Sequence, residues 1–193
     1  MCSDADERTV DELGREPGGT IVVNTITSRA VAEVVTAAGG RVAVSTVGHT
    51  RRKALMAETN AIFGGEHSAH YYFRDFWRAD TGMLAALHVL AMLGRGGSVS
   101  ALVNELPIYA ASGEINTSVS DPRGTMEQVA DALGDRGEVS WSDGLLISAE
   151  DWWVSVRESN TEPLLRLNVE AKDEATVAAL RDGALTIIRK ERG

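Results

Sequence analysis

The sequence predicts an α/β domain with a mostly parallel, mixed sheet, followed by a smaller α+β domain with an antiparallel sheet. Short β-branched strands alternate with amphipathic helices in residues 20–106, which is typical of a layer with substantially parallel strands. In residues 107–193, consecutive strand patterns with tight turns and helices segregated to one face favour antiparallel pairing. Residues 1–19 are polar and are expected to form a flexible lead-in. We expect the domain boundary near residues 104–112.

The first domain is predicted to begin with three strands, at residues 20–23, 41–45 and 61–63. Thr27 or Ser28 is expected to cap a helix that ends at Gly39-Gly40, because hydroxyls accept from the first backbone N–H groups and glycine favours a helix end. A second helix is expected at residues 49–58. The third strand leads directly into a glycine pair and a polar loop.

A third long helix is expected after Asp80, which has a side chain suited to an N-cap. Its apolar residues recur at helical spacing, so we expect them to be core. They are Met83, Leu84, Leu87, Leu90 and Ala91. A short helix is expected at residues 99–106, ending at Pro107.

The second domain carries several local signals for helix starts and turns. Asp121-Pro122 reads as an N-cap followed by a first-turn proline, and Gly134 as the end of that helix. Asp143-Gly144 lies between two strand patterns and predicts a hairpin. Asp173 is expected to cap the last helix, whose buried face is given by its apolar spacing. That face comprises Val177, Leu180, Ala184 and Ile187 or Ile188.

Composition excludes some classes of function. The net charge of −9 argues against broad binding to nucleic acids or anionic membranes. No apolar run approaches the roughly 20 residues that span a bilayer. The acidic N-terminus lacks the basic and apolar regions of a signal peptide. The single cysteine, Cys2, excludes an intrachain disulfide, and a cytoplasmic protein is therefore expected.

Two strand patterns enclose a polar loop at residues 158–164. Period-2 alternation places Arg157 and Arg166 on the polar sides of these strands, flanking the loop. Paired guanidinium groups with hydroxyl, amide and backbone donors suit a phosphate group. The alternative is a solvated hairpin with surface arginines.

A second polar loop follows the third predicted strand. Glu66 and Ser68 are two residues apart, so they point the same way if the loop is extended, and a carboxylate with a hydroxyl suits neighbouring sugar hydroxyls. His70 continues the alternation, and histidine exchanges protons near neutral pH. The alternative is that His67 and His70 are surface loop histidines.

Both loops resemble motifs of the phosphohexomutases, the phosphomannomutase/phosphoglucomutase family. The residues that carry the resemblance are Arg157-Glu158-Ser159-Asn160-Thr161-Glu162-Pro163 with Arg166, and Gly64-Gly65-Glu66-His67-Ser68-Ala69-His70. The first resembles the family's phosphate-binding loop and the second its sugar-specificity loop. The resemblance covers residues 18–190 and matches the last two of the family's four domains.

The resemblance implies roles for individual residues. Arg157, Ser159, Asn160, Thr161 and Arg166 would bind phosphate, Glu66 and Ser68 would bind sugar hydroxyls, and His70 would be the general acid/base. His49 corresponds to a segment near sugar and phosphate, although it also fits an exposed cationic helix start. Arg29 is a weaker candidate contact. Ala69 stands where the family more often has glycine.

The resemblance also implies Mg²⁺ as a cofactor and a hexose 1,6-bisphosphate as an activator. Residues 2–7 faintly resemble the family's metal loop, but Cys2, Ser3 and Glu7 replace its first aspartate, its glycine and its arginine. Two aspartates on a tail are a poor preorganised Mg²⁺ site, and we interpret them instead as part of a solvated acidic tail. We therefore predict no metal site in this chain. The family's phosphoserine loop has no match either.

Two hypotheses follow. In the first, the chain is a truncated phosphohexomutase that keeps sugar and phosphate recognition and is inactive alone, with mannose or glucose phosphates as ligands. A separate N-terminal half-enzyme would then complete the chain. Truncation would also expose an apolar patch, which self-association or that partner would cover. In the second, it is a non-catalytic phosphosugar-binding module or the relic of a broken gene. Neither involves nucleic acid or a membrane.

Overall fold

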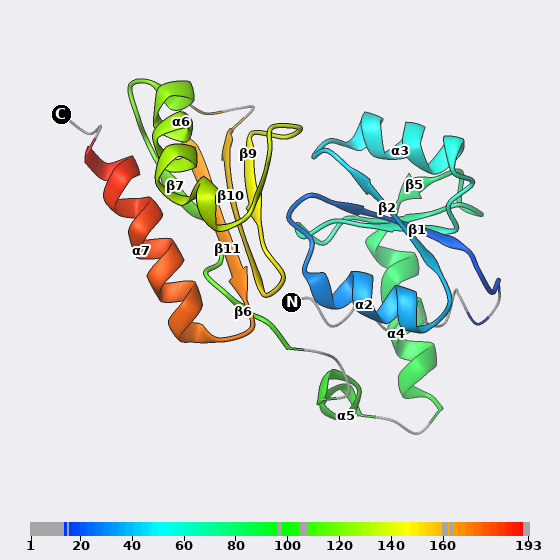
Figure 1. Cartoon of the computed structure of the whole chain (residues 1–193). Coiled ribbons are helices and arrows are strands. Elements are labelled where there is room, and N and C mark those ends of the chain that lie inside the picture. Colours follow the sequence, from blue (N-terminus) through cyan, green and yellow to red (C-terminus); the bar gives the residue numbers. More distant parts are fainter. Residues whose placement is uncertain are drawn as a thin grey trace. The chain divides into compact units, whose positions relative to one another are not determined.

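The computed structural model describes Gly14 and residues 16–95, 98–104, 108–159, 162 and 164–190. Its contacts divide the chain into two compact units, Met1–Ile108 and Tyr109–Gly193 (Figure 1). Each unit has its own sheet and its own hydrophobic core. The α/β and α+β classes predicted for the two parts of the chain are confirmed.

The first unit contains a five-stranded mixed sheet in the order β2-β1-β3-β4-β5. Its strands are β1 (Thr20–Asn24), β2 (Arg41–Ser45), β3 (Phe63–Gly65), β4 (Tyr71–Phe73) and β5 (Ala79–Asp80). β1 pairs in parallel with β2 and with β3, whereas β4 and β5 extend the sheet by antiparallel pairing. The parallel part therefore forms one side of the sheet and a short meander forms the other.

Helices cover both faces of this sheet. α2 (Arg29–Ala37) and α4 (Gly82–Leu93) pack on one face, where Ile21 and Phe63 meet Val31 and Ala85. α3 (His49–Glu58) covers the other face through Met56. α5 (Val99–Asn104) follows as a short helix.

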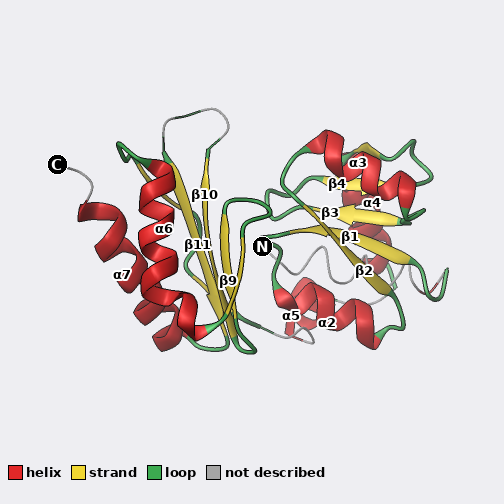
Figure 2. Ribbon diagram, turned by 45° about the horizontal axis from the view of Figure 1, so that its top comes forward, coloured by secondary structure: helices red, strands yellow, loops and turns green. Residues whose placement is uncertain are grey.

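The second unit contains a six-stranded sheet. Its strands are β6 (Ala110–Ala111), β7 (Ile115–Thr117), β8 (Glu138–Ser140), β9 (Leu145–Ser148), β10 (Trp152–Glu158) and β11 (Leu165–Ala171). All its strand pairs are antiparallel, in the order β6-β11-β10-β9-β8, with β7 also paired to β11. α6 (Pro122–Leu133) and α7 (Glu174–Lys190) lie on one face (Figure 2), and a single core joins them to the sheet.

Most helix starts follow the capping chemistry that the sequence predicts. The side chains of Ser28 and Asp121 accept from the first turns of α2 and α6, and Asp173 accepts from the backbone N–H of Thr176 at the start of α7. Gly144 has a φ of 72° in the β8–β9 turn, a left-handed conformation that favours glycine. The predicted bounds of β2 and α3 are also correct.

Two predictions around β3 and β5 are wrong. β3 begins at Phe63 and includes the glycine pair, which pairs with Tyr71 and Tyr72 of the unpredicted strand β4. A Cβ on Gly64 would lie 3.0 Å from the sulfur of Met56, so this strand position has little room for a side chain. Asp80 does not cap α4, because it lies in β5; Thr81 is the cap and accepts from the N–H of Leu84.

The buried stripe predicted for α4 is also wrong. Leu84 is partly buried and Ala85 is buried against the sheet, but Met83, Leu87 and Leu90 are 75%, 54% and 63% exposed. The helix is apolar around most of its circumference, so spacing alone does not tell which face meets the unit's own sheet. The larger side chains point away from it.

Residues 1–13 and 15 lie outside the described part of the chain, and so does the predicted metal-loop remnant at residues 2–7. Glu16, near the end of the expected lead-in, binds Arg74 through two hydrogen bonds of 3.0 and 2.6 Å. Within the described part of the chain, no helix is long and apolar enough to cross a membrane.

Candidate functional site

The candidate residues of the first unit lie beyond the carboxyl ends of its parallel strands. Arg29 is the first residue of α2 after β1, His49 is the first residue of α3 after β2, and residues 66–70 follow β3. The ends of parallel strands with their following loops are where α/β sheets bind ligands. The topology therefore places all of the predicted sugar-site residues at the same edge of the sheet.

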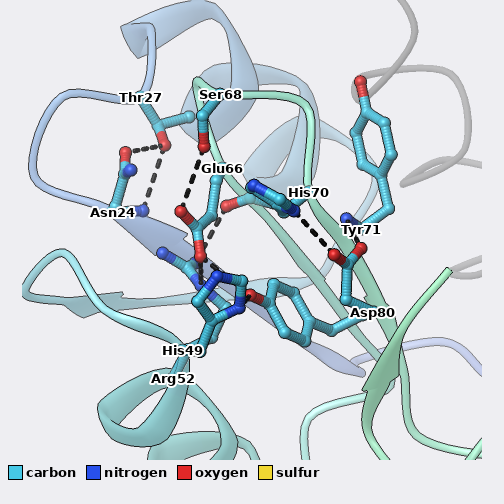
Figure 3. Close-up of polar contacts among 11 residues, drawn as sticks. Asn24, Thr27, His49, Arg52, Glu66, Ser68, His70, Tyr71 and Asp80 are labelled. Carbon is cyan, nitrogen blue, oxygen red and sulfur yellow. Dashed lines mark hydrogen bonds and ion pairs between the residues drawn. The ribbon is translucent and has the colours of Figure 1, made fainter. Parts of the chain in front are cut away.

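Glu66 is the centre of a hydrogen-bonded network (Figure 3). Its Oε1 accepts from Arg52 Nε at 3.0 Å and from the Tyr72 hydroxyl at 3.0 Å, and its Oε2 accepts from Ser68 Oγ at 3.2 Å. Burial opposes ionisation of Glu66, but the charge of Arg52 and these three hydrogen bonds outweigh it, so its pKa is lowered. Glu66 is therefore a fixed carboxylate with one oxygen turned toward Ser68.

Arg52 is completely buried. Besides Glu66, it binds the backbone oxygen of Gly65 through Nη1 at 2.9 Å, and its guanidinium lies 5.6 Å from the ring centre of Tyr72. Burying a guanidinium is costly without a charge partner, and Glu66 provides that partner. Arg52 thus fixes the position of Glu66 from the buried side of the site.

His70 is held by Asp80, the residue that the sequence places at a helix cap. Asp80 Oδ2 lies 2.6 Å from His70 Nδ1, and its Oδ1 accepts from the N–H of Tyr71 at 2.9 Å. Burial opposes ionisation of Asp80, but the hydrogen bonds from His70 and Tyr71 prevail and lower its pKa. An ionised carboxylate only accepts, so Nδ1 of His70 carries a proton and Nε2 faces away from Asp80.

His49 lies beside His70 and is fixed in a similar way. Their rings meet edge to face with centroids 4.9 Å apart, and Nδ1 of His49 contacts the hydroxyl of Tyr72. That hydroxyl has one proton, which it donates to the ionised Glu66. Nδ1 of His49 is therefore the donor to Tyr72, so the network links both histidines to acidic groups by their Nδ1 atoms.

The loop from Glu66 to His70 is a tight turn, so the extended conformation on which the alternation argument depended is not present. Its ends are closed by hydrogen bonds from Glu66 N to His70 O and from Ala69 N to Glu66 O, both 3.0 Å. Ala69 has a φ of 64°, which explains why glycine suits this position. Ser68 still meets Glu66, whereas His70 turns toward Asp80 (Figure 3).

The second unit brings Arg157 and Arg166 together. They occupy directly opposite positions on β10 and β11, and both bind Glu114: Arg157 Nη2 to Oε2 at 3.3 Å and Arg166 Nη1 to Oε1 at 3.1 Å. Arg166 Nη2 also donates to Ser159 Oγ at 3.0 Å. We call Arg157, Arg166, Ser159 and Glu114 the arginine cluster.

Arg157 is not the solvated surface arginine of the alternative prediction, because it is only 8% exposed. Burial and the neighbouring charge of Arg166 lower its pKa, and Glu114 and Asp143 oppose this effect. Asn160, Thr161 and Pro163 lie outside the described residues. The structure thus places three of the five predicted phosphate contacts in one cluster.

Sequence reasoning missed four residues of these sites. Tyr72 continues the alternation of Glu66, Ser68 and His70, which is a signal that was available. Arg52 and Asp80 are distant in sequence from the loop they support, and Glu114 is 43 residues before Arg157. Packing of α3 on the sheet brings in Arg52, and strand pairing brings in Asp80 and Glu114.

A metal cluster is not evident in the part of the chain that the structure describes. Within those residues no group of three or more His, Cys, Asp or Glu side chains is arranged to hold a metal ion.

Family models match both units. The model described as "Phosphoglucomutase/phosphomannomutase, alpha/beta/alpha domain III" matches residues 5–109, and the one described as "Phosphoglucomutase/phosphomannomutase, C-terminal domain" matches residues 114–186. The matched ranges hold the Glu66 network and the arginine cluster, respectively.

Curated relatives and solved structures agree with these matches. The chain is 37% identical to phosphohexose mutases of Xanthomonas campestris pv. campestris and 38% identical to the phosphomannomutase of Salmonella montevideo, over 88% of its own length and 38% of theirs. A phosphoglucomutase/phosphomannomutase family protein from Burkholderia thailandensis is 28% identical, with a TM-score of 0.84 over 99% of this chain and 42% of that one. The chain thus spans about two fifths of the length of these relatives.

Some solved structures of much lower identity share the fold of this chain. The N-acetylphosphoglucosamine mutase of Aspergillus fumigatus, 12% identical, has been solved with glucose 1,6-bisphosphate and with GlcNAc-6P and magnesium. At this identity the likeness to the present chain is one of fold, with TM-scores of 0.70 and 0.64. With both units matched by its models, the chain belongs to the phosphoglucomutase/phosphomannomutase family.

Proposed function

We propose that this chain recognises a phosphorylated hexose, with the first unit binding the sugar and the second unit binding its phosphate. The observation that carries the proposal is the pairing of Arg157 and Arg166 beside Ser159. Two guanidinium groups at facing strand positions offer several N–H donors to one tetrahedral anion. Asn160 and Thr161 belong to the proposed contacts by their place in the motif.

In the first unit, Glu66 and Ser68 are the proposed partners of two sugar hydroxyls. The lowered pKa of Glu66 keeps it an acceptor at neutral pH, so it binds hydroxyl protons. His49 and Arg29, at the starts of α3 and α2, are proposed to lie near the ligand as well. Mannose and glucose phosphates share the hydroxyls that Glu66 and Ser68 would bind, and both are candidate ligands.

His70 is the proposed general acid/base. With Nδ1 held by Asp80, its Nε2 is the atom that exchanges a proton with a substrate hydroxyl. The family reaction moves a phosphoryl group between the one and six positions of a hexose, and it also needs a nucleophilic serine. Mg²⁺, where it is bound, neutralises phosphoryl charge.

These 193 residues include no match to the serine loop, so we propose that they bind the ligand without converting it. A companion chain with the serine and metal loops would complete the reaction. The alternative is a binding module whose role ends with recognition. Restored conversion on mixing with such a companion separates the first possibility from the second.

A phosphorus NMR titration tests the proposal. Mannose 1-phosphate and then glucose 1-phosphate are added to the chain with magnesium and a trace of the bisphosphate, and the ligand signal is followed. We expect broadening or a shift that Arg157→Ala abolishes and that the surface variant Arg123→Ala retains, since Arg123 pairs with the exposed Glu127 and stacks on Trp141, outside the arginine cluster. No change with either ligand would overturn the proposal, and conversion to the 6-phosphate would overturn the claim of inactivity.

A further inference from the structure

Glu114 is the one residue of the arginine cluster that lies outside the phosphate-loop motif and has no role predicted from it. It lies between Gly113, which has a φ of 67°, and β7. β7 pairs with β11 so that Ile115 faces Leu167 and Asn116 faces Arg166. The backbone on the C-terminal side of Glu114 is therefore fixed in the sheet, close to the strand that carries Arg166.

The arginine cluster needs an anion whether or not a ligand is present. Arg157 and Arg166 are directly opposite on neighbouring antiparallel strands, a position in which like charges destabilise a sheet. Arg157 is also buried, which makes an uncompensated charge more costly. Glu114 gives one oxygen to each arginine and so offsets part of both charges, which leaves the three groups with a net positive charge.

The contacts that Glu114 makes leave donors for a second anion. A guanidinium group carries five N–H donors, and Glu114 receives one bond from Nη2 of Arg157 and one from Nη1 of Arg166. The other terminal nitrogen of Arg166 is directed at Ser159, a predicted phosphate contact. A phosphate does not have to displace Glu114 to reach this part of the cluster.

We propose that Glu114 is a positioning residue for phosphate binding, which stays bound to both arginines and holds their remaining N–H donors in one orientation. This inference rests on the proposed function, because it assumes that the arginine cluster binds phosphate. It adds that a carboxylate, which repels phosphate, strengthens the site by preorganising it. The opposing possibility is that Glu114 merely occupies the place of the phosphate.

The two possibilities predict opposite effects of Glu114→Gln. If Glu114 positions the arginines, the variant binds mannose 1-phosphate about 10-fold more weakly, although it removes a negative charge. If Glu114 only competes, the variant binds more tightly. Glu127→Gln is the matched control, because it removes the same charge from an arginine pair of the second unit, that with Arg123, which is exposed and lies outside the arginine cluster. We expect this control to bind as the wild type does or slightly more tightly.

The titration is done on the full chain by phosphorus NMR, with the arginine Nε–Hε signals recorded by ¹⁵N NMR. In the wild type, the signals of Arg157 and Arg166 are expected at dispersed shifts, and in Glu114→Gln they are expected to move toward those of exposed arginines while amide signals elsewhere stay in place. Glu114→Asp, which keeps the charge, is expected to recover part of the lost affinity.

Unchanged or tighter binding by Glu114→Gln overturns the inference while the proposed function stands. If the amide signals of the second unit collapse in Glu114→Gln, that variant is unfolded and Glu114→Asp is used in its place. The inference is overturned if Glu114→Asp keeps its amide signals and changes the arginine signals, yet binds with wild-type affinity. If the wild type binds neither mannose 1-phosphate nor inorganic phosphate, the proposed function fails and this role of Glu114 fails with it.

Discussion

At the scale of single residues, Glu66 and Arg52 form the most deeply buried ion pair of the candidate site, with side chains 6% and 0% exposed. Glu66→Gln would leave the guanidinium without a charge partner, and losing one partner of a buried pair costs about 3 kcal/mol. We expect the first unit to be destabilised by about that amount in urea unfolding followed by its amide NMR signals. The double variant Glu66→Gln with Arg52→Met should lose less, and an equal or greater loss would contradict this account.

The same residue gives the first unit a dependence on acid. The pKa of Glu66 is lower in the folded protein than its ordinary value, so its contribution to stability is complete above that ordinary value. It is lost as the pH falls through the lowered folded value. Acid titration of unfolding free energy should show this loss in the wild type and a shallower one in Glu66→Gln.

Asp80 is a second residue whose role a single substitution tests. In Asp80→Asn, one oxygen remains to serve two donors, His70 Nδ1 and the N–H of Tyr71. We expect the imidazole of His70 to change from a single Nδ1-protonated tautomer to a mixture, as seen in imidazole ¹⁵N shifts. His88 stacks on Phe73 and serves as the internal control, since its signals should not move.

At the scale of elements, the loop after β3 carries a local strain at Ala69. An alanine in the left-handed region costs about 1–2 kcal/mol, part of which is offset because glycine is freer in the unfolded chain. Ala69→Gly is therefore expected to stabilise the first unit by up to about 1 kcal/mol in the same urea experiment. A destabilisation would mean that the methyl group makes a contact that matters more than its φ.

The elements also show what sequence can and cannot predict. The caps at Ser28, Asp121 and Asp173 act within a few residues, so local chemistry was sufficient to predict them. Asp80 has the chemistry of a cap, yet strand pairing places it opposite Tyr72, where it serves His70 instead. The buried face of α4 was predicted wrongly for a similar reason. Both faces of this helix are apolar, and only the tertiary fold determines that Ala85 is buried and Leu87 is exposed.

In the candidate site, the residues within the two loops could be predicted from their motifs, but the residues that support these loops could not. Strand register brings Arg157 opposite Arg166, as the alternation predicts. Tyr72 could have been found from its alternation with Glu66, Ser68 and His70, but Arg52, Asp80 and Glu114 come from other elements, and no local pattern specifies their contacts. The positions of these supporting residues depend on how the strands pair and how α3 packs in the folded protein.

At the scale of the whole molecule, α4 presents an apolar surface made of Met83, Leu87 and Leu90, each more than half exposed. Surfaces of this kind mark sites of association. We expect the chain to self-associate in sedimentation velocity, and Leu87→Glu with Leu90→Glu to shift it toward monomer. Val44→Glu, at an exposed apolar position on β2, is the control that should leave association unchanged. A monomeric wild type would refute the prediction.

The distribution of tryptophan between the units has a consequence for spectroscopy. Trp77, the only one of the four before residue 109, is 82% exposed, whereas Trp152 and Trp153 are buried in the second unit. An indole already in water changes its emission little on unfolding, while a buried indole shifts to longer wavelengths. Intrinsic fluorescence therefore reports the unfolding of the second unit, with its arginine cluster. It should change little when the unit that holds Glu66 and His70 unfolds.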